Sequence, residues 1–430
     1  MRRCSACRCS RSSIETPLPM MSHTVLDSIA LGYEPVWNRA RELAAVRLGV
    51  RAVHPESVDA AHLMQALGDD WPESAPVLVL AVDSPRLLQQ TLACEPVHNA
   101  WIEVPGSQFE HPETLARLNV AARRGHRLLR RADLASVRGE VVAPAGARTL
   151  LKLGAEDAQH LLMLPPGGPG RASPLLDRVV EGVASRTLAR LCLDDAGAWG
   201  LLGWPDDDVL YAHRQEPLNY DAAVIRQILL AIGDEDCSLE HLERLVRQDP
   251  VLVYRILLLV NSAAYGLRHE IASLRHALMM LGFRELGRWL AEQLPHSEPD
   301  RDLHPVRYAM VMRSRLAQHL LATGSDDNLR GEVYTTALLS QLDRLLHQPL
   351  GELLYRLPLS GRVFDAVLRH DGPYHPLLDV ARAQGEPGQL HRLPAVCQRH
   401  DLSLEHANRA LIRMLASSRD HASPRSERMT

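Results

Sequence analysis

The stretch DPVLVYRILLLVNSAAYG, residues 249–266, combines a long apolar run with polar residues at both ends. Asp249 suits the N-cap of a helix, and Pro250 suits the first helical position, where its missing N–H leaves no partner unsatisfied. Apart from Arg255 the run is apolar on almost every side, which predicts a helix at the centre of a helical bundle. Because a membrane span needs about 20 apolar residues, this segment is too short to cross a bilayer. Gly266 suits the turn that follows.

Composition narrows the class of protein further. The 430 residues carry a net charge of -4, so we expect no nucleic-acid polymer as a partner. Four of the seven cysteines stand singly along the chain, which fits a reducing cytoplasm, and no apolar segment is long enough for a membrane anchor. Residues 1–22 are basic and Ser-rich and are expected to be a disordered leader; their CSACRC motif lacks the second ligand pair of a zinc site.

The first half of the chain alternates short apolar runs with amphipathic stretches. Such alternation over about 180 residues predicts a parallel α/β sheet or barrel, which we place at residues 23–206. The runs that we expect to be buried strands are Ala75–Val82, Ala100–Val104, His126–Arg131 and Arg148–Leu153.

Only helical periodicity follows the segment GWPDDD, residues 203–208. Ser238 can cap a helix that continues to Val246, and Gly282 separates two further helical patterns. We therefore expect an all-α domain over residues 207–416, followed by a disordered tail at residues 417–430. The fold class expected is a multidomain chain with an N-terminal α/β barrel and a C-terminal all-α domain.

The helical segment Leu245–Leu286 resembles the HDOD domain, the regulatory relative of the HD metal-dependent phosphohydrolases. The resemblance implies an all-α regulatory domain, in which we expect Asn261 and Ser262 to satisfy the end of a helix rather than bind a ligand. The motif residues that carry it are Asp249, Pro250, Asn261, Ser262, Tyr265, Gly266, Ile271, Ala277, Leu281 and Gly282.

The resemblance also locates the metal ligands that an HD phosphohydrolase would need. The His-Asp pair of that family falls on Ser340 and Gln341, neither of which supplies a charged metal ligand. The dipeptides His370-Asp371 and His400-Asp401 lie outside that register, and among 21 histidines we expect them to be chance pairs without a metal role. At Cys397 and His400, spaced as C-x-x-H, we expect solvated surface. No metal and no cofactor are expected in this domain.

The first half resembles the EAL domain, a barrel that hydrolyses cyclic di-GMP with two metals held by carboxylates. The opening strand pair lies in Tyr33–Arg51, and Lys152 matches the Lys of a later strand. Metal-binding carboxylates of that family fall on residues without a carboxylate, which are Arg47, Arg131, Ala132, Gly154 and Ala184. The resemblance therefore implies a degenerate barrel without metal-dependent hydrolysis.

Three hypotheses follow for the function. The first is a non-catalytic bacterial signal-transduction adaptor, not an enzyme, that acts by protein–protein contact with partners the sequence does not name. The second is a metal-independent cyclic di-GMP receptor in which Arg47, Arg131 and Lys152 hold phosphate groups. The third, an active hydrolase, would need three or more carboxylate or His side chains in one cleft, which the register does not provide.

Overall fold

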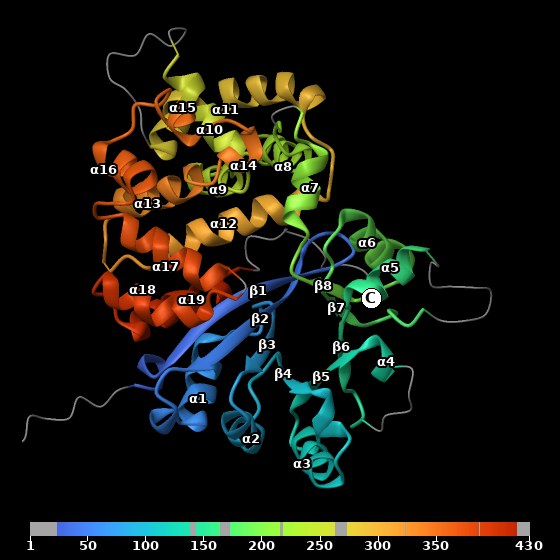
Figure 1. Cartoon of the computed structure of the whole chain (residues 1–430). Coiled ribbons are helices and arrows are strands. Elements are labelled where there is room, and N and C mark those ends of the chain that lie inside the picture. The colour runs from blue at the N-terminus through green and yellow to red at the C-terminus, as the bar shows by residue number, and fades with distance from the viewer. Residues whose placement is uncertain are drawn as a thin grey trace, which may run out of the picture.

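The computed structural model describes residues 24–137, 143–163, 173–215, 218–262, 273–322, 324–386 and 388–418. It has a barrel domain and a helical region that lies along one side of the barrel (Figure 1). The predicted fold class is therefore confirmed. The expected leader and all but residues 417 and 418 of the expected tail lie outside the described residues. None of the described helices is long and apolar enough to span a membrane.

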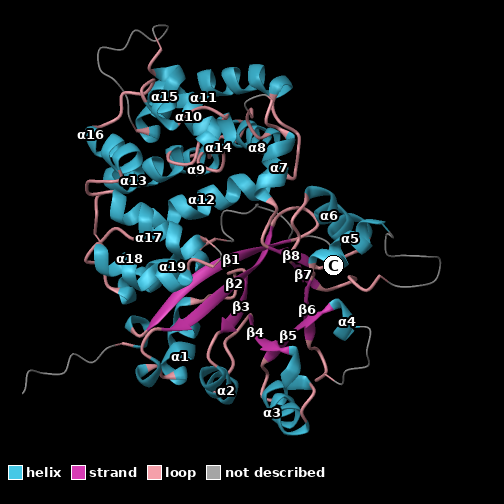
Figure 2. Cartoon of the chain, viewed as in Figure 1, coloured by secondary structure: helices cyan, strands magenta, loops and turns pink. Residues whose placement is uncertain are grey.

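The barrel is closed by eight strands in sequential order (Figure 2). β1 runs antiparallel to both of its neighbours, and all other neighbouring pairs are parallel. The four strands predicted from apolar runs are all present, with ends shifted by two residues or fewer. The strands are β1 (Ile29–Trp37), β2 (Leu43–Ala52), β3 (Val77–Val82), β4 (Ala100–Pro105), β5 (Arg127–Asp133), β6 (Arg148–Lys152), β7 (Val179–Glu181) and β8 (Gly200–Leu202).

Helices connect the parallel strands and cover the outside of the barrel. Several begin at a side-chain cap: Ser84 accepts a hydrogen bond from the Leu87 amide, and Ser185 accepts one from the Leu188 amide. The helices are α1 (Ala60–Asp70), α2 (Pro85–Ala93), α3 (Pro112–Arg123), α4 (Leu134–Val137), α5 (Ala155–Met163) and α6 (Arg186–Arg190). Short 3-10 or π segments are η1 (Val25–Asp27), η2 (Pro55–Ser57), η3 (Gly106–Phe109) and η4 (Leu191–Asp195).

The helical region begins with α7 (Asp206–Ala212) and contains no strand among its described residues. Its longer helices are α8 (Ala222–Ile232), α9 (Leu239–Val246), α10 (Pro250–Val260), α11 (Leu274–Gln293), α12 (Leu303–His319), α13 (Asp327–Leu339), α17 (His375–Gly385) and α19 (Leu404–Ala416). Shorter ones are η6 (Leu294–His296), α14 (Asp343–Leu346), α15 (Leu350–Leu354), α16 (Gly361–Phe364), η7 (Asp365–Arg369), η8 (Leu390–Arg392) and α18 (Leu393–Arg399).

Helix α10 is the central helix that the opening stretch predicts. The Asp249 side chain accepts hydrogen bonds from the amides of Val251 and Leu252, and eight of the eleven helical residues are buried. The predicted break at Gly282 is also present inside α11, where this residue has φ 70° and ψ 161°. A positive φ of this kind favours glycine, which explains why the helical pattern is interrupted there.

The last helices pack against the first strand of the barrel. The Asn408 amide on α19 donates to the carbonyls of Leu26 and Ile29, at 2.7 Å each, and accepts from the Leu31 amide at 3.1 Å. On α17, Gln384 Nε2 donates to the Leu31 carbonyl at 3.2 Å. A Cβ atom on Gly32 would lie 3.1 Å from the Gln384 carbonyl oxygen, so the small residue permits this close approach. One apolar core therefore runs continuously from the barrel into the helical region.

Candidate functional site

The carboxyl ends of the parallel strands form the mouth of the barrel, the face where barrels of this architecture hold their active sites. A layer of buried apolar residues fills the interior below that mouth: Val36, Ala45, Val79, Trp101, Leu129, Leu150, Val179 and Leu202. Because side chains alternate along a strand, the residue two positions further toward the mouth also faces inward. In six of the eight strands this rule reaches a charged residue, and these six residues form the mouth layer: Glu34, Arg47, Glu103, Arg131, Lys152 and Glu181.

Two of the predicted cations in the mouth layer meet at one carboxylate. Arg47 Nε lies 2.7 Å from Glu103 Oε2, and Arg131 Nη1 lies 3.4 Å from Glu103 Oε1. Arg47 also pairs with Glu34 at 3.6 Å, and Arg131 pairs with Glu181 at 2.8 Å. Both guanidinium groups are therefore held by carboxylates of the protein itself.

Lys152 behaves differently from the two arginines. It follows Leu150 on the same face of β6, but its side chain is exposed, and no ion pair to it is described. The mouth layer thus holds three acidic and three basic side chains, with the basic ones split between two paired arginines and one solvated lysine. Of the three cations that the receptor hypothesis places in one anion pocket, Arg47 and Arg131 contact the same carboxylate, whereas Lys152 does not.

Burial sets the protonation behaviour of the mouth layer. Burial raises the pKa of the Glu34 carboxyl above its ordinary value, although the neighbouring Arg47 opposes the rise. Burial also disfavours the charged form of Arg47, but its hydrogen bonds to Glu103, together with the negative charges of Glu103, Glu34 and Glu181, outweigh burial and raise the pKa of this guanidinium. Arg47 is therefore a permanent cation at the mouth.

Three carboxylates of this layer, Glu34, Glu103 and Glu181, were not expected from the sequence. The expectation that the mouth lacks a cluster of three carboxylate or His ligands stays a prediction, because these glutamates share one layer but are not among the described residues whose ligand atoms all lie within 4.8 Å of one another. A signal was available, because Glu103 lies inside the predicted strand Ala100–Val104 and faces the carboxyl end of the barrel.

The other positions assigned to missing EAL ligands carry no charge. Ala132 is buried, whereas Gly154 and Ala184 are exposed. The Gly154 amide donates to Asp157 Oδ2 at 3.4 Å, at the start of α5.

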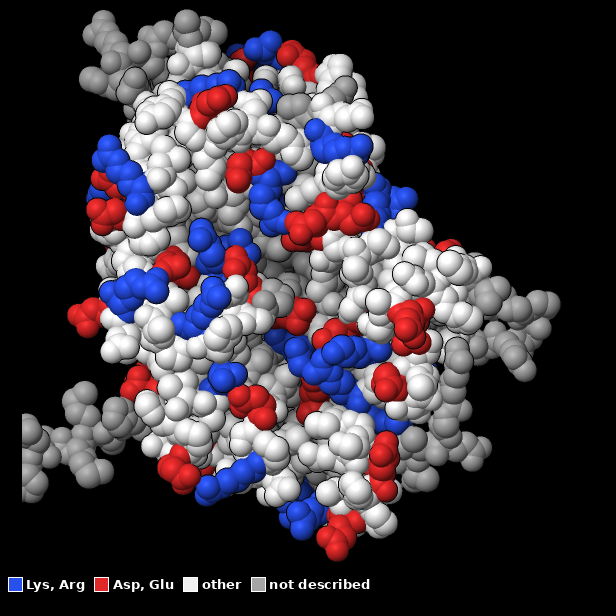
Figure 3. All heavy atoms as spheres, viewed as in Figure 1, with Lys and Arg blue, Asp and Glu red and all other residues white. Residues whose placement is uncertain are grey.

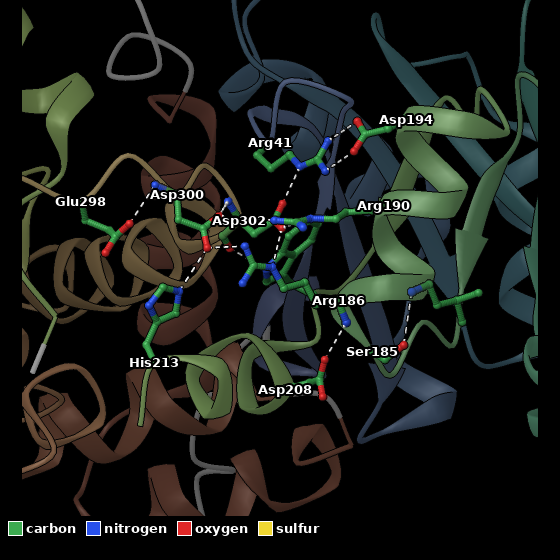
Figure 4. A network of polar contacts seen from close by, with 12 residues as sticks. Arg41, Ser185, Arg186, Arg190, Asp194, Asp208, His213, Glu298, Asp300 and Asp302 are labelled. Atoms are coloured by element: carbon green, nitrogen blue, oxygen red, sulfur yellow. Dashed lines mark hydrogen bonds and ion pairs between the residues drawn. The ribbon is translucent and has the colours of Figure 1, made fainter. Parts of the chain in front are cut away.

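A second group of charged residues joins the barrel to the helical region (Figure 4). We call Arg41, Arg186, Arg190, Asp194, Asp300 and Asp302 the interdomain network. Asp302, at the start of α12, receives Arg41 Nε at 2.9 Å, Arg186 Nε at 2.8 Å and Arg190 Nε at 2.7 Å. All three arginines come from the barrel side, so Asp302 is the point at which the two domains are tied together.

Arg41 is the best-connected cation of the interdomain network. It lies in the turn between β1 and β2, its side chain is 2% exposed, and its two Nη atoms contact Asp194 at 2.6 and 2.7 Å. The hydrogen bond from Arg41 lowers the pKa of the Asp194 carboxyl below its ordinary value. Nearby, His213 Nε2 lies 3.1 Å from Asp300 Oδ2, which extends the contact to α7.

In the helical region, Ser340 and Gln341, to which the sequence resemblance assigns the His-Asp pair of HD phosphohydrolases, make bonds within the domain. Ser340 Oγ donates to the Ala337 carbonyl at 2.8 Å. Gln341 is buried, donates to the same carbonyl at 2.9 Å and accepts from Arg313 Nη1 at 3.0 Å. Neither side chain is available as a metal ligand in this arrangement.

Those HDOD motif residues that the structure describes make bonds within the helical region. Asp249 is fully buried, pairs with Arg307 Nη1 at 2.8 Å and accepts from the Asp221 amide at 2.6 Å, so it links α8, α10 and α12. Burial raises the pKa of this carboxyl. Asn261 and Ser262 donate to carbonyls of the last turn of α10, as expected. Tyr265 and Gly266 lie outside the described residues.

A cavity of about 330 Å³ opens in the helical region between α9, α12 and α13. Its lining includes Glu243, Arg247 and Arg275, and Glu243 pairs with both arginines at 2.5 and 3.0 Å. Here, as at the barrel mouth, arginine and glutamate side chains neutralise one another. Over the face shown in Figure 3, acidic and basic side chains are likewise interspersed.

Comparison with known proteins identifies a domain family in part of the chain. The model of the HDOD domain matches residues 218–348. Over 160 residues the chain is 27% identical to the uncharacterized protein YuxH of Bacillus subtilis, covering 36% of this chain and 39% of that protein. Over 168 residues it is 26% identical to cyclic di-GMP phosphodiesterase CdgJ of Vibrio cholerae, covering 39% of each. The chain thus spans about two fifths of the length of these relatives.

Solved structures give a weaker likeness. The MmoQ response regulator of Methylococcus capsulatus is 21% identical, with a TM-score of 0.30, covering 46% of this chain and 98% of that one. The PaMucR phosphodiesterase in complex with c-di-GMP is 16% identical, with a TM-score of 0.26, covering 41% of this chain and 89% of that one. The matched family and the strand order together lead to one conclusion: the chain joins a closed eight-stranded barrel to a helical region that contains an HDOD domain.

Proposed function

We propose that this chain is a non-catalytic adaptor in bacterial cyclic di-GMP signalling and that it acts in the cytoplasm through protein–protein contact. Similarity to a cyclic di-GMP phosphodiesterase and the matched HDOD domain support the signalling context. The observation that carries the non-catalytic part is the pairing of Arg47 and Arg131 with one carboxylate, Glu103.

The pairing matters because a metal-dependent hydrolase needs carboxylates that are free to neutralise a divalent cation. In the mouth layer, two guanidinium groups take that place. Two like unit charges 4 Å apart in a partly buried site repel by about 4 kcal/mol, and a divalent ion doubles the repulsion from each arginine. Metal binding would therefore have to displace both arginines from Glu103.

The direct test is to incubate the purified full chain with cyclic di-GMP and Mn²⁺, following binding by calorimetry and turnover by chromatography. We expect no turnover. Turnover that a chelator abolishes would contradict the proposal, since it would mean that the mouth or another site still holds catalytic metal.

The receptor hypothesis remains the alternative, in which Arg47, Arg131 and Lys152 bind cyclic di-GMP without metal. Its support is that all three cations face the same mouth, with Lys152 exposed. Binding without turnover that is weakened by Arg47→Ala and Lys152→Ala, but not by Arg51→Ala on the same strand as Arg47, would favour the receptor. Absence of binding would favour the adaptor, and the search would move to protein partners.

A further inference from the structure

Two histidines and one aspartate meet on the outside of the helical region, far from the HDOD match in sequence. His375 is the first residue of α17, and Asp379 lies one turn later on the same helix. His400 is the C-cap of α18, which packs beside α17. Among the residues that the structure describes, this is the one group of three such side chains whose candidate ligand atoms all lie within 4.8 Å of one another.

The contacts within the cluster are close to those of a metal site. His400 Nε2 lies 2.9 Å from Asp379 Oδ2, and the rings of His375 and His400 are 5.4 Å apart at 83°. Ligands bound tetrahedrally to zinc at about 2.0–2.1 Å are separated from one another by roughly 3.3 Å. A bound ion therefore requires the His400–Asp379 contact to widen by a few tenths of an ångström and the other two contacts to close by 1.5 Å at most.

The donor set selects the class of ion. Two imidazoles and one carboxylate suit zinc and the neighbouring divalent transition metals, whereas Mg²⁺ and Ca²⁺ require oxygen ligands. The fourth ligand is water or His370, whose ring lies 5.6 Å from that of His375. Cys397 does not take part: the side chain is buried in the core, and burial raises the pKa of this thiol to about 11.

Two cations stand near the cluster: Arg382, whose charge acts on His375, and Arg399, which contacts Asp379 directly. Arg399 Nη1 lies 3.3 Å from Asp379 Oδ2, but its side chain is 64% exposed, so it can turn into solvent at little cost. His400 and Asp379 are far less exposed, at 11% and 19%. The expectation of plain solvated surface at His400 is therefore wrong, because this ring is largely covered and hydrogen-bonded.

We propose that His375, Asp379 and His400 form a binding site for a divalent transition-metal ion of the zinc class. The ion links α17 to α18 in the helical layer that lies against the first strand of the barrel. Since Gln384 on α17 bonds to the Leu31 carbonyl, metal binding stabilises the seam between the two domains. This proposal is independent of the function proposed above, which concerns the barrel mouth.

The test uses the full chain with Cys4, Cys7 and Cys9 replaced by Ser, so that thiols near the N-terminus do not bind metal. The protein is stripped with a chelator, freed of it, and titrated with Co²⁺ followed by visible absorption, and with Zn²⁺ in competition with a chromophoric chelator. We expect one tetrahedral Co²⁺ per chain and a Zn²⁺-dependent rise in melting temperature. Asp379→Asn and His400→Ala should each weaken binding by more than about 100-fold, since losing an outer-shell partner alone costs 10–100-fold.

The control is His62→Ala. His62 on α1 and Asp59 at its N-cap form a similar contact at 3.2 Å, but within the described part of the chain no third ligand completes a group there, so the variant should bind Co²⁺ like the parent. A further variant, His375→Ala, changes the first residue of α17 and provides a second test if another variant misfolds. Circular dichroism in the absence of metal checks that each variant is folded. Unchanged Co²⁺ affinity in folded Asp379→Asn and His375→Ala variants, or no binding by the parent, would overturn the proposal.

Discussion

The mouth layer and the interdomain network contain the same charges in different surroundings. Each has three acidic and three basic side chains, and each is centred on one carboxylate that receives more than one arginine. Arg131 and Glu181 in the mouth layer are 33% and 21% exposed, whereas Arg41 and Asp302 in the network are 2% and 3% exposed. The mouth layer lies within one domain, while the network crosses between two.

The same numbers of acidic and basic side chains therefore contribute differently to stability in the two regions. Partial exposure weakens the ion pairs of the mouth layer and leaves Lys152 in solvent, so this layer contributes less to stability than fully buried pairs do. Burial makes the loss of Arg41 or Asp302 costly, because the remaining buried charges would stay without partners. The network therefore fixes how the domains are joined.

The largest effect is expected from Asp302→Ala. Removing one partner from a buried ion pair typically costs about 3–5 kcal/mol, and here three arginines lose a contact. We expect a matching drop in the free energy of unfolding, measured by denaturant titration. The matched control is Asp207→Ala, because Asp207 is fully exposed and contacts Arg344 only at 3.5 Å. Equal effects of the two substitutions would remove the distinction between network and surface pairs.

A smaller loss of stability is expected when Arg47 and Arg131 are both changed to Ala. The partly exposed pairs should contribute about 1–3 kcal/mol in total. The double variant leaves Glu34, Glu103 and Glu181 without their guanidinium partners, so Mn²⁺ should raise its melting temperature but not that of the wild type. Arg51→Ala, an exposed residue of β2, is the control. A double variant indifferent to Mn²⁺ would show that these acids cannot gather around an ion.

Acidification should act on the two regions with opposite sign. The pKa of Asp194 is lowered, so its contribution to stability is present above its unfolded pKa of about 3.9 and is lost as pH falls through the folded value. The pKa of Glu34 is raised, so its protonation near its folded pKa favours the folded state. In melting curves between pH 3 and 7, Asp194→Asn should remove part of the stability loss that the wild type shows at low pH. Glu34→Gln should raise stability at neutral pH. Parallel curves for both variants and the wild type would contradict this reading.

The smallest effect is expected from Lys152→Ala. Since the side chain is exposed and no ion pair to it is described, the free energy of unfolding should change by less than about 0.5 kcal/mol. The same variant should remove one positive charge at the mouth and so weaken any cyclic di-GMP binding. A large loss of stability measured by thermal melting would mean that Lys152 is bonded within the mouth layer.

The sequence predicts those parts of the fold that depend on local patterns. Apolar runs such as Ala75–Val82 locate strands, Asp249 and Pro250 locate the start of the central helix, and Gly282 marks the break in α11. The resemblance to the EAL domain adds the meeting of Arg47 and Arg131, because it assigns both residues to metal-ligand positions of one barrel.

The interdomain network could not be predicted in this way. Arg41 and Asp302 are 261 residues apart in sequence, and an ion pair between distant residues leaves no periodic or local signal. The His375–Asp379–His400 cluster has a partial signal, since a His and an Asp four residues apart share a helix face. The third member comes from another helix, and only packing brings it there.

The bonds between Asn408 and the η1–β1 segment have a consequence for synthesis of the chain. Asn408 is 382 residues beyond Leu26, whose carbonyl it binds. A ribosome adding about 5–20 residues per second needs roughly 20–80 s to cover that distance. During this interval the outer edge of the first strand has no α19 to pair with and is open to chaperones or to another nascent chain. Joining the first strand to α19 therefore makes this part of folding wait until residue 408 has been synthesised.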